Sequence, residues 1–361
     1  MTVSKSALTQ RLAAAGAHTL GRMFHLYDRD DTPLPAQEFL RPHATTKRYG
    51  FSHINVVIPD LPAPHRHLSC MALLGRAGAA CFDNDFLPGS PRDTATLAIG
   101  TAATGSDGFR AYSMSRDCDL REDGTYLRFG DELTITGSFP DFRVVIQDRD
   151  LSIDIAVTCT DQTTTFVRNP VYDHVGHPAR YRGALTWEGH RHPIEGVLSF
   201  EYARATSLTA FRDKTVPTLL KLPVTHFEWQ VIKIKPDTLL MFADASAFGQ
   251  SMLTSGYLKQ LDGTSQRHTR NVTHEILCYR DEFAVAPDGY ATRIPAEFRW
   301  RIHAPDGDVS TEIVGITDTD LLYGIGRGWL GGFSYTGHHQ GSPVEGVAYL
   351  EYVRLNDPGR L

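Results

Sequence analysis

The stretch PIEGVLSFEYAR at residues 193–204 recurs as PVEGVAYLEYVR at residues 343–354. The two stretches align without a gap, and the second begins 150 positions after the first. After a two-residue slip, the match continues upstream from WEGH at residues 187–190 to YTGH at residues 335–338. A match this dense at a domain-sized spacing indicates that one structural unit occurs twice, because solenoid repeats have much shorter periods.

Length and composition limit the class of protein. A chain of 361 residues favours two domains. A net charge of −6 argues against nucleic acid or an anionic membrane as a partner. No apolar run approaches membrane-spanning length, and no secretory signal is visible. The cysteines are odd in number and lack CxxC spacing, which suits a reduced cytoplasm: Cys70, Cys81, Cys118, Cys159 and Cys278. We therefore expect a cytoplasmic protein, with its oligomeric state left open.

From Tyr49 onward, short runs of alternating polar and apolar residues are separated by Gly, Pro, Asp and Asn. Clear examples are 51–58 (FSHINVVI), 142–147 (FRVVIQ), 272–279 (VTHEILCY) and 346–353 (GVAYLEYV). Many short strands at this spacing predict an all-β protein built from antiparallel barrels or sandwiches.

The expected organisation has four parts. Residues 1–48 form an N-terminal helix and an arm, with the helix at 6–24 after a Ser6 cap. Residues 49–205 form a first barrel, 206–224 a linker and 225–361 a second barrel. Each half has the size of an up-and-down barrel, and the repeated strand closes both. We expect the repeated Glu201 and Glu351 to lie outside or between the barrels, with a structural role.

Two tandem barrels that each end in a Gly-x-x-x-Glu-Tyr strand resemble the double-lipocalin, calycin-like group. That group includes carotenoid hydratases, AttH-like proteins, kievitone hydratase and lipocalin-like Diels–Alderases. The resemblance implies two antiparallel lipocalin-like β-barrels with a short N-terminal helix, and a chain in a bacterial branch of the group.

The second half opens with His226-Phe227-Glu228-Trp229, and Phe242-Ala243-Asp244 follows. This order is similar to the His, Trp and aromatic-x-Asp positions that carotenoid hydratases use for acid-catalysed addition of water. The chain departs from that pattern, because Trp229 is three residues after His226 rather than two and Phe242 replaces a tyrosine.

Polar residues within apolar strands point independently to a site. His226 and Glu228 share one face of their strand, and His53 and Asn55 share a face of the corresponding strand in the first half. Asp244 follows the apolar run LLMFA, so burial is expected to raise its pKa and to suit it to general-acid catalysis. Asp244 could equally cap a turn at the end of its strand.

The predicted site lies in the second half or where the halves meet. Asp244 is the expected proton donor, with His226 or Glu228 orienting it or sharing its proton. The expected substrate-binding residues are Trp229, Phe242, Tyr323, Trp329, His53 and Asn55. Tyr323 and Trp329 flank a glycine-rich run that lacks the helix of a dinucleotide site, so they could form an aromatic wall or simply pack a barrel end.

Three histidine clusters, at residues 65–67, 190–192 and 338–339, are interpreted as surface loops rather than metal ligands. No metal and no other cofactor is predicted. The expected function is a cofactor-free lyase or isomerase acting on a hydrophobic, isoprenoid or polyketide-like small molecule, by acid-catalysed hydration, dehydration or cyclisation. The alternative is a non-catalytic protein that binds a hydrophobic ligand. An ionisable cluster inside a barrel favours the enzyme, and a purely apolar lining favours the carrier.

Overall fold

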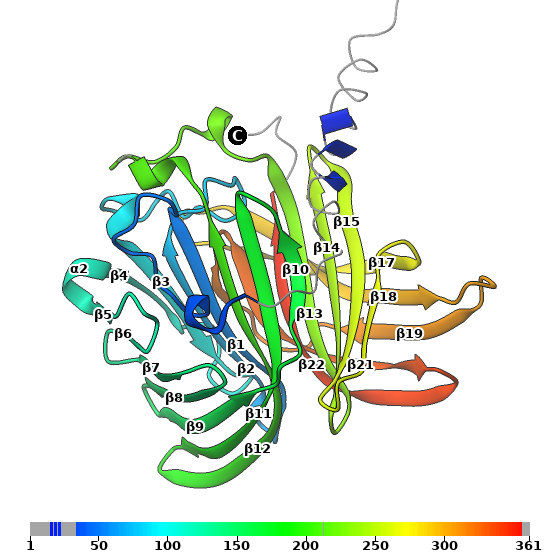
Figure 1. Ribbon diagram of the computed structural model, residues 1–361. Helices are drawn as coiled ribbons and strands as arrows, with labels where there is room; N and C mark the ends of the chain where they lie inside the picture. Colours follow the sequence, from blue (N-terminus) through cyan, green and yellow to red (C-terminus); the bar gives the residue numbers. More distant parts are fainter. Residues whose placement is uncertain (1–14, 17, 20, 23–33, 212, 356–361) are drawn as a thin grey trace, which may run out of the picture.

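The computed structural model describes residues 34–211 and 213–355, with six further positions between residues 15 and 22. Most of this chain lies in two antiparallel sheets, which confirms the all-β prediction (Figure 1). None of the described helices has the length and apolar character needed to cross a membrane. The helix predicted at 6–24 falls largely outside the described residues. The short helical segments are η1 (Ala36–Glu38), η2 (Pro91–Asp93), α2 (Met114–Asp117), η3 (Leu208–Phe211) and η4 (Thr218–Leu220).

The first sheet has the strand order β4-β3-β2-β1-β12-β11-β9-β8-β7-β6-β5, and β10 pairs with β11 beside this path. Its strands are β1 (Phe51–Leu61), β2 (Arg66–Gly75), β3 (Thr94–Gly100), β4 (Phe109–Ser113), β5 (Cys118–Leu120), β6 (Tyr126–Phe129), β7 (Leu133–Ser138), β8 (Asp141–Asp148), β9 (Leu151–Cys159), β10 (Thr164–Arg168), β11 (Tyr172–Trp187) and β12 (His190–Ala205).

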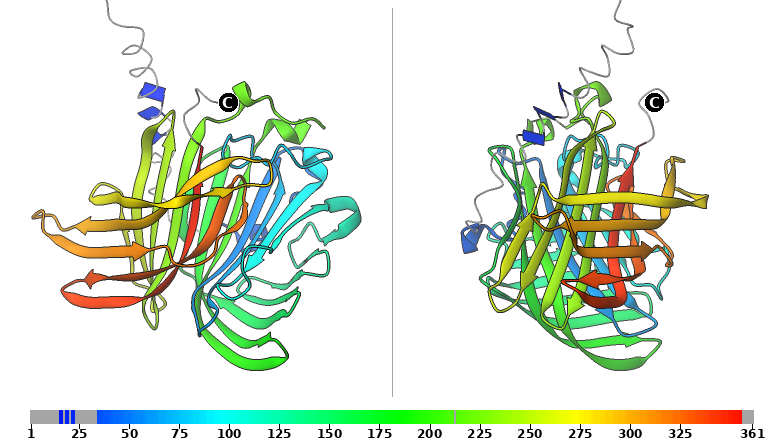
Figure 2. Two further views of the ribbon diagram at one scale, coloured as in Figure 1. Left: turned by 180° about the vertical axis from the view of Figure 1, so that it is seen from behind. Right: turned by 90° about the vertical axis from the view of Figure 1, so that its right-hand side faces the viewer.

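The second sheet has the strand order β16-β15-β14-β13-β22-β21-β19-β18-β17, and β20 pairs with β21. Its strands are β13 (Val224–Lys235), β14 (Thr238–Ala247), β15 (Gln250–Gln260), β16 (Ser265–His268), β17 (Val272–Val285), β18 (Ala291–His303), β19 (Val309–Ile316), β20 (Leu322–Ile325), β21 (Gly328–His339) and β22 (Ser342–Arg354). Each sheet curls around a core of its own, and the two lie side by side (Figure 2).

The duplication seen in the sequence is a duplication of topology. The strand β12 lies between β1 and β11, and its counterpart β22 lies between β13 and β21. Strand β1 then pairs with β2 as β13 pairs with β14. The repeated closing strands therefore hold equivalent places in the two sheets, as predicted.

The upstream part of the sequence match is wrong. Gly189 lies in the turn between β11 and β12, directly after Glu188, and both residues have positive φ. Its structural counterpart is Gly341, which follows Gln340 in the turn between β21 and β22 with the same signs of φ. Gly337, to which the sequence match assigned Gly189, lies within β21 opposite Ile313. Both hairpins thus use a two-residue turn that favours glycine, but the first hairpin is longer.

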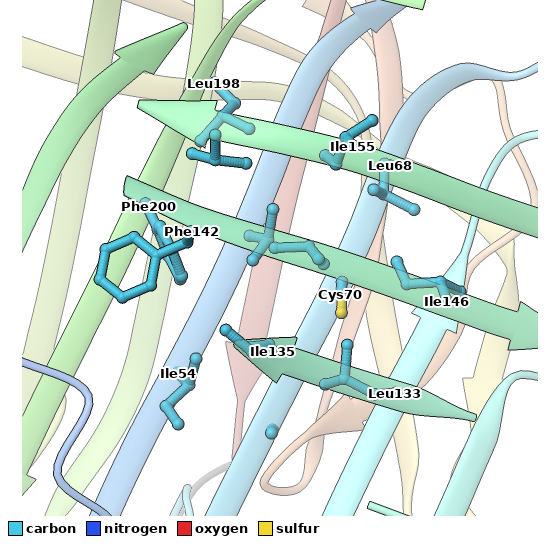
Figure 3. Packing of buried hydrophobic residues seen from close by; sticks show 14 of the residues in the cluster. Ile54, Leu68, Cys70, Leu133, Ile135, Phe142, Ile146, Ile155, Leu198 and Phe200 are labelled. Carbon is cyan, nitrogen blue, oxygen red and sulfur yellow. The ribbon is translucent and has the colours of Figure 1, made fainter. Parts of the chain in front are cut away.

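The first barrel is filled by its own side chains (Figure 3). Strand β8 shows the cause, since Phe142, Val144 and Ile146 are buried, whereas the alternate positions Arg143 and Gln147 are exposed and Val145 is half-buried. The arm before β1 closes this core, because Phe39 packs against Phe200 with ring centroids 5.4 Å apart and Leu40 is fully buried. The inner face of the first barrel is therefore a packed apolar core.

The outer faces of the two sheets pack against each other. A mixed cluster contains Met71 and Leu73 from β2 together with Trp229 from β13 and Tyr349 from β22. The β20–β21 hairpin completes the contact, because a Cβ on Gly324 would lie 2.3 Å from the Cβ of Ala98 in β3. The glycine-rich run therefore allows close packing between domains, and it leads into a strand rather than a helix.

Candidate active site

One row of side chains crosses the inner face of the second barrel. Register places Trp329 opposite Tyr352, Tyr352 opposite Glu228, Glu228 opposite Asp244 and Asp244 opposite Thr254. Directly opposed residues in antiparallel strands point to the same face, so these five side chains form a continuous band. The band lies near one end of the barrel, where β13 and β21 begin and β14 and β22 finish.

Asp244 binds two histidines. Its Oδ2 lies 3.2 Å from Nε2 of His226 and 4.0 Å from Nδ1 of His274, and its Oδ1 accepts a hydrogen bond of 2.7 Å from Thr254. Burial alone would raise the pKa of Asp244, but the hydrogen bonds and charges of the two histidines lower it well below its usual range. The expectation that Asp244 is a neutral acid is therefore wrong, because its partners come from strands that the local apolar run does not reveal.

Glu228 has the opposite character. Its side chain is fully buried, and burial raises its pKa although His274 and His226 lie nearby and oppose the shift. Gln230 donates a hydrogen bond of 2.6 Å to Oε1, and His274 Nε2 lies 3.5 Å from the same atom. Among the described residues, Oε2 has no hydrogen-bond partner, so this oxygen is left to hold a proton or to meet a reacting group.

His274, on β17, joins the two carboxylates. Burial alone would lower the pKa of His274, but the charges of Glu228 and Asp244 and a hydrogen bond to Asp244 outweigh burial and raise it. Its ring stacks on Trp300 with centroids 4.0 Å apart and an interplanar angle of 12°. A protonated imidazole on an indole face gains cation–π stabilisation. His274 is absent from the predicted site, although it is a polar residue in the predicted strand 272–279 and so carries the same signal that identified His226.

Some aromatic rings of the second barrel pack against the acid–base residues, and others line a cleft between the domains. Phe242 stacks on Trp300 with ring centroids 4.6 Å apart. The sequence predicted Phe242 as a site residue, but it did not indicate Trp300. Tyr323 and Trp329 contact each other edge to face at 5.5 Å and line an open cleft of about 360 Å³ between the domains. Phe109 of the first domain lines the same cleft. Its volume is in the range of small-molecule pockets.

Three of the predicted binding residues lie elsewhere. Trp229 follows Glu228 directly, so it points to the opposite face of β13 and into the domain interface. Asn55 and His53 lie on the interface face of β1. Strands β1 and β13 correspond, as predicted, but His53 and Asn55 are not the counterparts of His226 and Glu228. Asn55 pairs with Glu201 as Trp229 pairs with Glu351, and Asn55 is thus the counterpart of Trp229.

The same register identifies the counterparts of the band in the first barrel. They are Val175, Tyr202, Ile54, Ala72 and Leu97, in the order of Trp329, Tyr352, Glu228, Asp244 and Thr254. Only Tyr202 keeps a polar group, and its hydroxyl donates to the carbonyl of Arg41 at 2.8 Å. The two halves have therefore diverged, with the ionisable cluster restricted to the second barrel.

Only one of the three histidine clusters lies at the surface as predicted. His190 and His192 are exposed, as expected. His65 and His67 are both buried. Nδ1 of His65 lies 3.0 Å from the hydroxyl of Thr101, and the ring of His67 packs against Gly332 of the second domain. His339 is also buried and lies 2.9 Å from the hydroxyl of Thr311. Within the described chain, no three His, Cys, Asp or Glu side chains converge in a way that could hold a metal ion.

Two barrels in one chain, closed by equivalent strands and packed face to face, define a double-barrel, lipocalin-like fold. The chain belongs to a family described as a family of unknown function, DUF6670, whose pattern matches residues 71–359.

Solved structures agree on the fold. A candidate AttH protein of Nitrosomonas europaea superposes with a TM-score of 0.59 and 13% identity, over 90% of this chain and 98% of that one. Kievitone hydratase of Nectria haematococca superposes with a TM-score of 0.55 and 11% identity, over 90% of this chain and 94% of that one. None of the curated proteins matches the chain. The inferred resemblance to the double-lipocalin group is thus confirmed for the fold.

Proposed function

We propose that the protein is an acid–base enzyme that adds water to, removes water from, or cyclises a hydrophobic small molecule of isoprenoid or polyketide type. The observation that supports this proposal is the buried cluster of His226, Glu228, Asp244 and His274 inside a barrel. Ionisable groups are expensive to bury, and a carrier of apolar ligands has no use for them. The fold shared with kievitone hydratase is consistent with this class of reaction.

In the proposed reaction, Glu228 is the proton donor, a role that replaces the one expected for Asp244. Burial raises the pKa of Glu228 and so favours its protonated form, and its unpartnered oxygen can deliver the proton to an alkene carbon. The C=C π electrons form the new C–H bond and leave a carbocation, which an aromatic ring of the band such as Trp329 stabilises. Water then attacks the cation and returns a proton to Glu228. The charge of His274 stabilises the transient Glu228 carboxylate.

The proposal is tested in D₂O and H₂¹⁸O with a panel of isoprenoid and polyketide-type alkenes and tertiary alcohols. The wild-type protein is expected to introduce deuterium at carbon and ¹⁸O in the alcohol, or deuterium alone if it cyclises. Glu228→Gln is expected to remove this incorporation, whereas Glu345→Gln, at an exposed position of β22, is expected to keep it. Binding of the panel with no isotope incorporation by the wild type would instead establish a carrier.

A further inference from the structure

Two glutamates are buried where the domains meet. Glu201 of β12 and Glu351 of β22 occupy equivalent places in the repeat and are 1% and 2% exposed. Each accepts a hydrogen bond from the other domain. Asn55 Nδ2 donates to Glu351 Oε1 at 2.8 Å, and Trp229 Nε1 donates to Glu201 Oε1 at 3.2 Å. Because Asn55 and Trp229 are themselves counterparts, the two contacts are related by the same pseudo-twofold symmetry as the sheets.

Each carboxylate also has a neutral donor on its own strand. Ser199 donates to Glu201 at 2.8 Å, and Tyr349 donates to Glu351 at 3.0 Å. In the described chain, neither glutamate forms an ion pair with a lysine or an arginine. A histidine lies beside one of them, since His174 Nε2 is 3.8 Å from Glu201 Oε2. Two negative charges in such surroundings would be poorly compensated.

Other titratable groups face this cluster from every strand packed on it. Burial, with the charge of His174 adding to it, lowers the pKa of His53 well below its usual range. Burial, with Arg66 adding to it, lowers the pKa of His67 to about 3. Neither histidine can therefore supply a positive charge near neutral pH. The groups that face the cluster are His53 (β1), His67 (β2), Tyr172 and His174 (β11) and Tyr349 (β22). Lys259 on β15 and Arg267 on β16 donate to the carbonyls of Thr163 and Thr165.

The pair lies directly behind the candidate site. Trp229, which binds Glu201, is the neighbour of Glu228 on β13. Glu351, which binds Asn55, is the neighbour of Tyr352 on β22. Since successive residues of a strand point to opposite faces, these two strands present the interface on one side and the band of site residues on the other. A shift of the interface hydrogen bonds would therefore move the backbone that carries Glu228.

We propose that Glu351 holds a proton where the domains meet, and that this one-proton pair of Glu351 and Glu201 positions β13 and β22 against the first domain. Glu201 and Glu351 are thus positioning residues. The effect on the site rests on the proposed function, whereas the one-proton pair at the interface does not.

The direction of the pH effect follows from Glu351. Burial, with the charge of Glu201 adding to it, raises the pKa of Glu351 well above its ordinary value. The folded state then binds this proton more tightly than the unfolded state. The stabilisation is complete below the ordinary carboxyl pKa and is lost as the pH rises towards the raised pKa.

The test is thermal unfolding of the full chain from about pH 5 to about pH 9. The Tm of the wild type is expected to fall relative to that of Glu351→Gln by about 3 °C or more across this range, because the amide imitates the neutral acid. Glu345→Gln, exposed on the same strand, is expected to follow the wild type. If the curves of Tm against pH for the wild type and Glu351→Gln are parallel, the one-proton pair is disproved.

Asn55→Asp provides a second test that does not require Glu351→Gln to fold. It replaces the amide that donates to Glu351 by a third carboxyl group, so its Tm is expected to fall with pH more steeply than that of the wild type. If the slope of Tm against pH equals that of the wild type, the one-proton pair is disproved.

The role at the site has its own readout, the alkaline limb of the pH–rate profile with a substrate found in the isotope assay. Glu351→Gln is expected to extend activity to higher pH without changing the acid limb. An unchanged profile together with the expected Tm curves would overturn the positioning role and leave both the pair and the proposed function intact.

Discussion

Turnover of the Asp244→Asn variant is expected to fall by about 10²–10⁴-fold, with the fold preserved. The asparagine is nearly isosteric and can still accept the hydrogen bond from Thr254, but it removes the negative charge that lies 3.2 Å from His226 and 4.0 Å from His274. His274 then loses one of the two charges that raise its pKa, and the transient carboxylate of Glu228 loses its cationic neighbour.

The measurement has one arm that needs no substrate. An NMR titration of His274 is expected to show a lower pKa in Asp244→Asn than in the wild type. The matched control is Asp150→Asn, in an exposed turn of the first barrel, which should change neither the titration nor the rate. Near-normal turnover by Asp244→Asn would remove Asp244 from the catalytic cluster, and an unchanged titration would disprove its coupling to His274.

The second large effect concerns stability. Phe200→Ala is expected to lower the free energy of unfolding by about 3–5 kcal/mol, because it leaves a cavity in a packed core. Phe200 is fully buried and contacts Phe39 and Phe142, with centroids 5.4 Å and 5.2 Å away. Phe211→Ala makes the same chemical change at a side chain that is 73% exposed and should have little effect.

Urea unfolding of both variants provides the comparison. A loss below about 1 kcal/mol in Phe200→Ala would mean that the first barrel is loosely packed rather than solid. A loss in the expected range with unchanged binding of the substrate would separate the role of the first barrel from that of the second.

Most of the fold could be predicted from the sequence, because the repeated strand shows which distant segments hold equivalent places. A strand that occurs twice at domain spacing must hold equivalent places, and β12 and β22 do so. The slipped match around Gly189 failed because glycines are common in strands as well as turns, and local identity cannot tell Gly337 in a strand from Gly341 in a turn.

The site was readable only in part, for physical reasons. His226, Glu228 and Asp244 stand out as polar residues in apolar strands, and the structure brings them together. Trp229 was grouped with them on the order of residues alone, although the two-residue period of a strand places it on the other face. The charge of Asp244 could not be inferred, since it depends on His274, which is 30 positions away in sequence and reaches it only through the curvature of the sheet.

The divergence of the two bands also determines how the molecule tolerates change. Buried ionisable groups reduce stability, and a protein can keep them only while its total stability stays above the threshold for folding. Ile54, Ala72 and Leu97 belong to the apolar core of the first barrel, and a separate apolar cluster joins the two barrels, so we expect the first barrel to stabilise the second. Stabilising substitutions in the first barrel should therefore widen the range of second-barrel variants that fold, which makes the first barrel the place to begin when the specificity of the second is engineered.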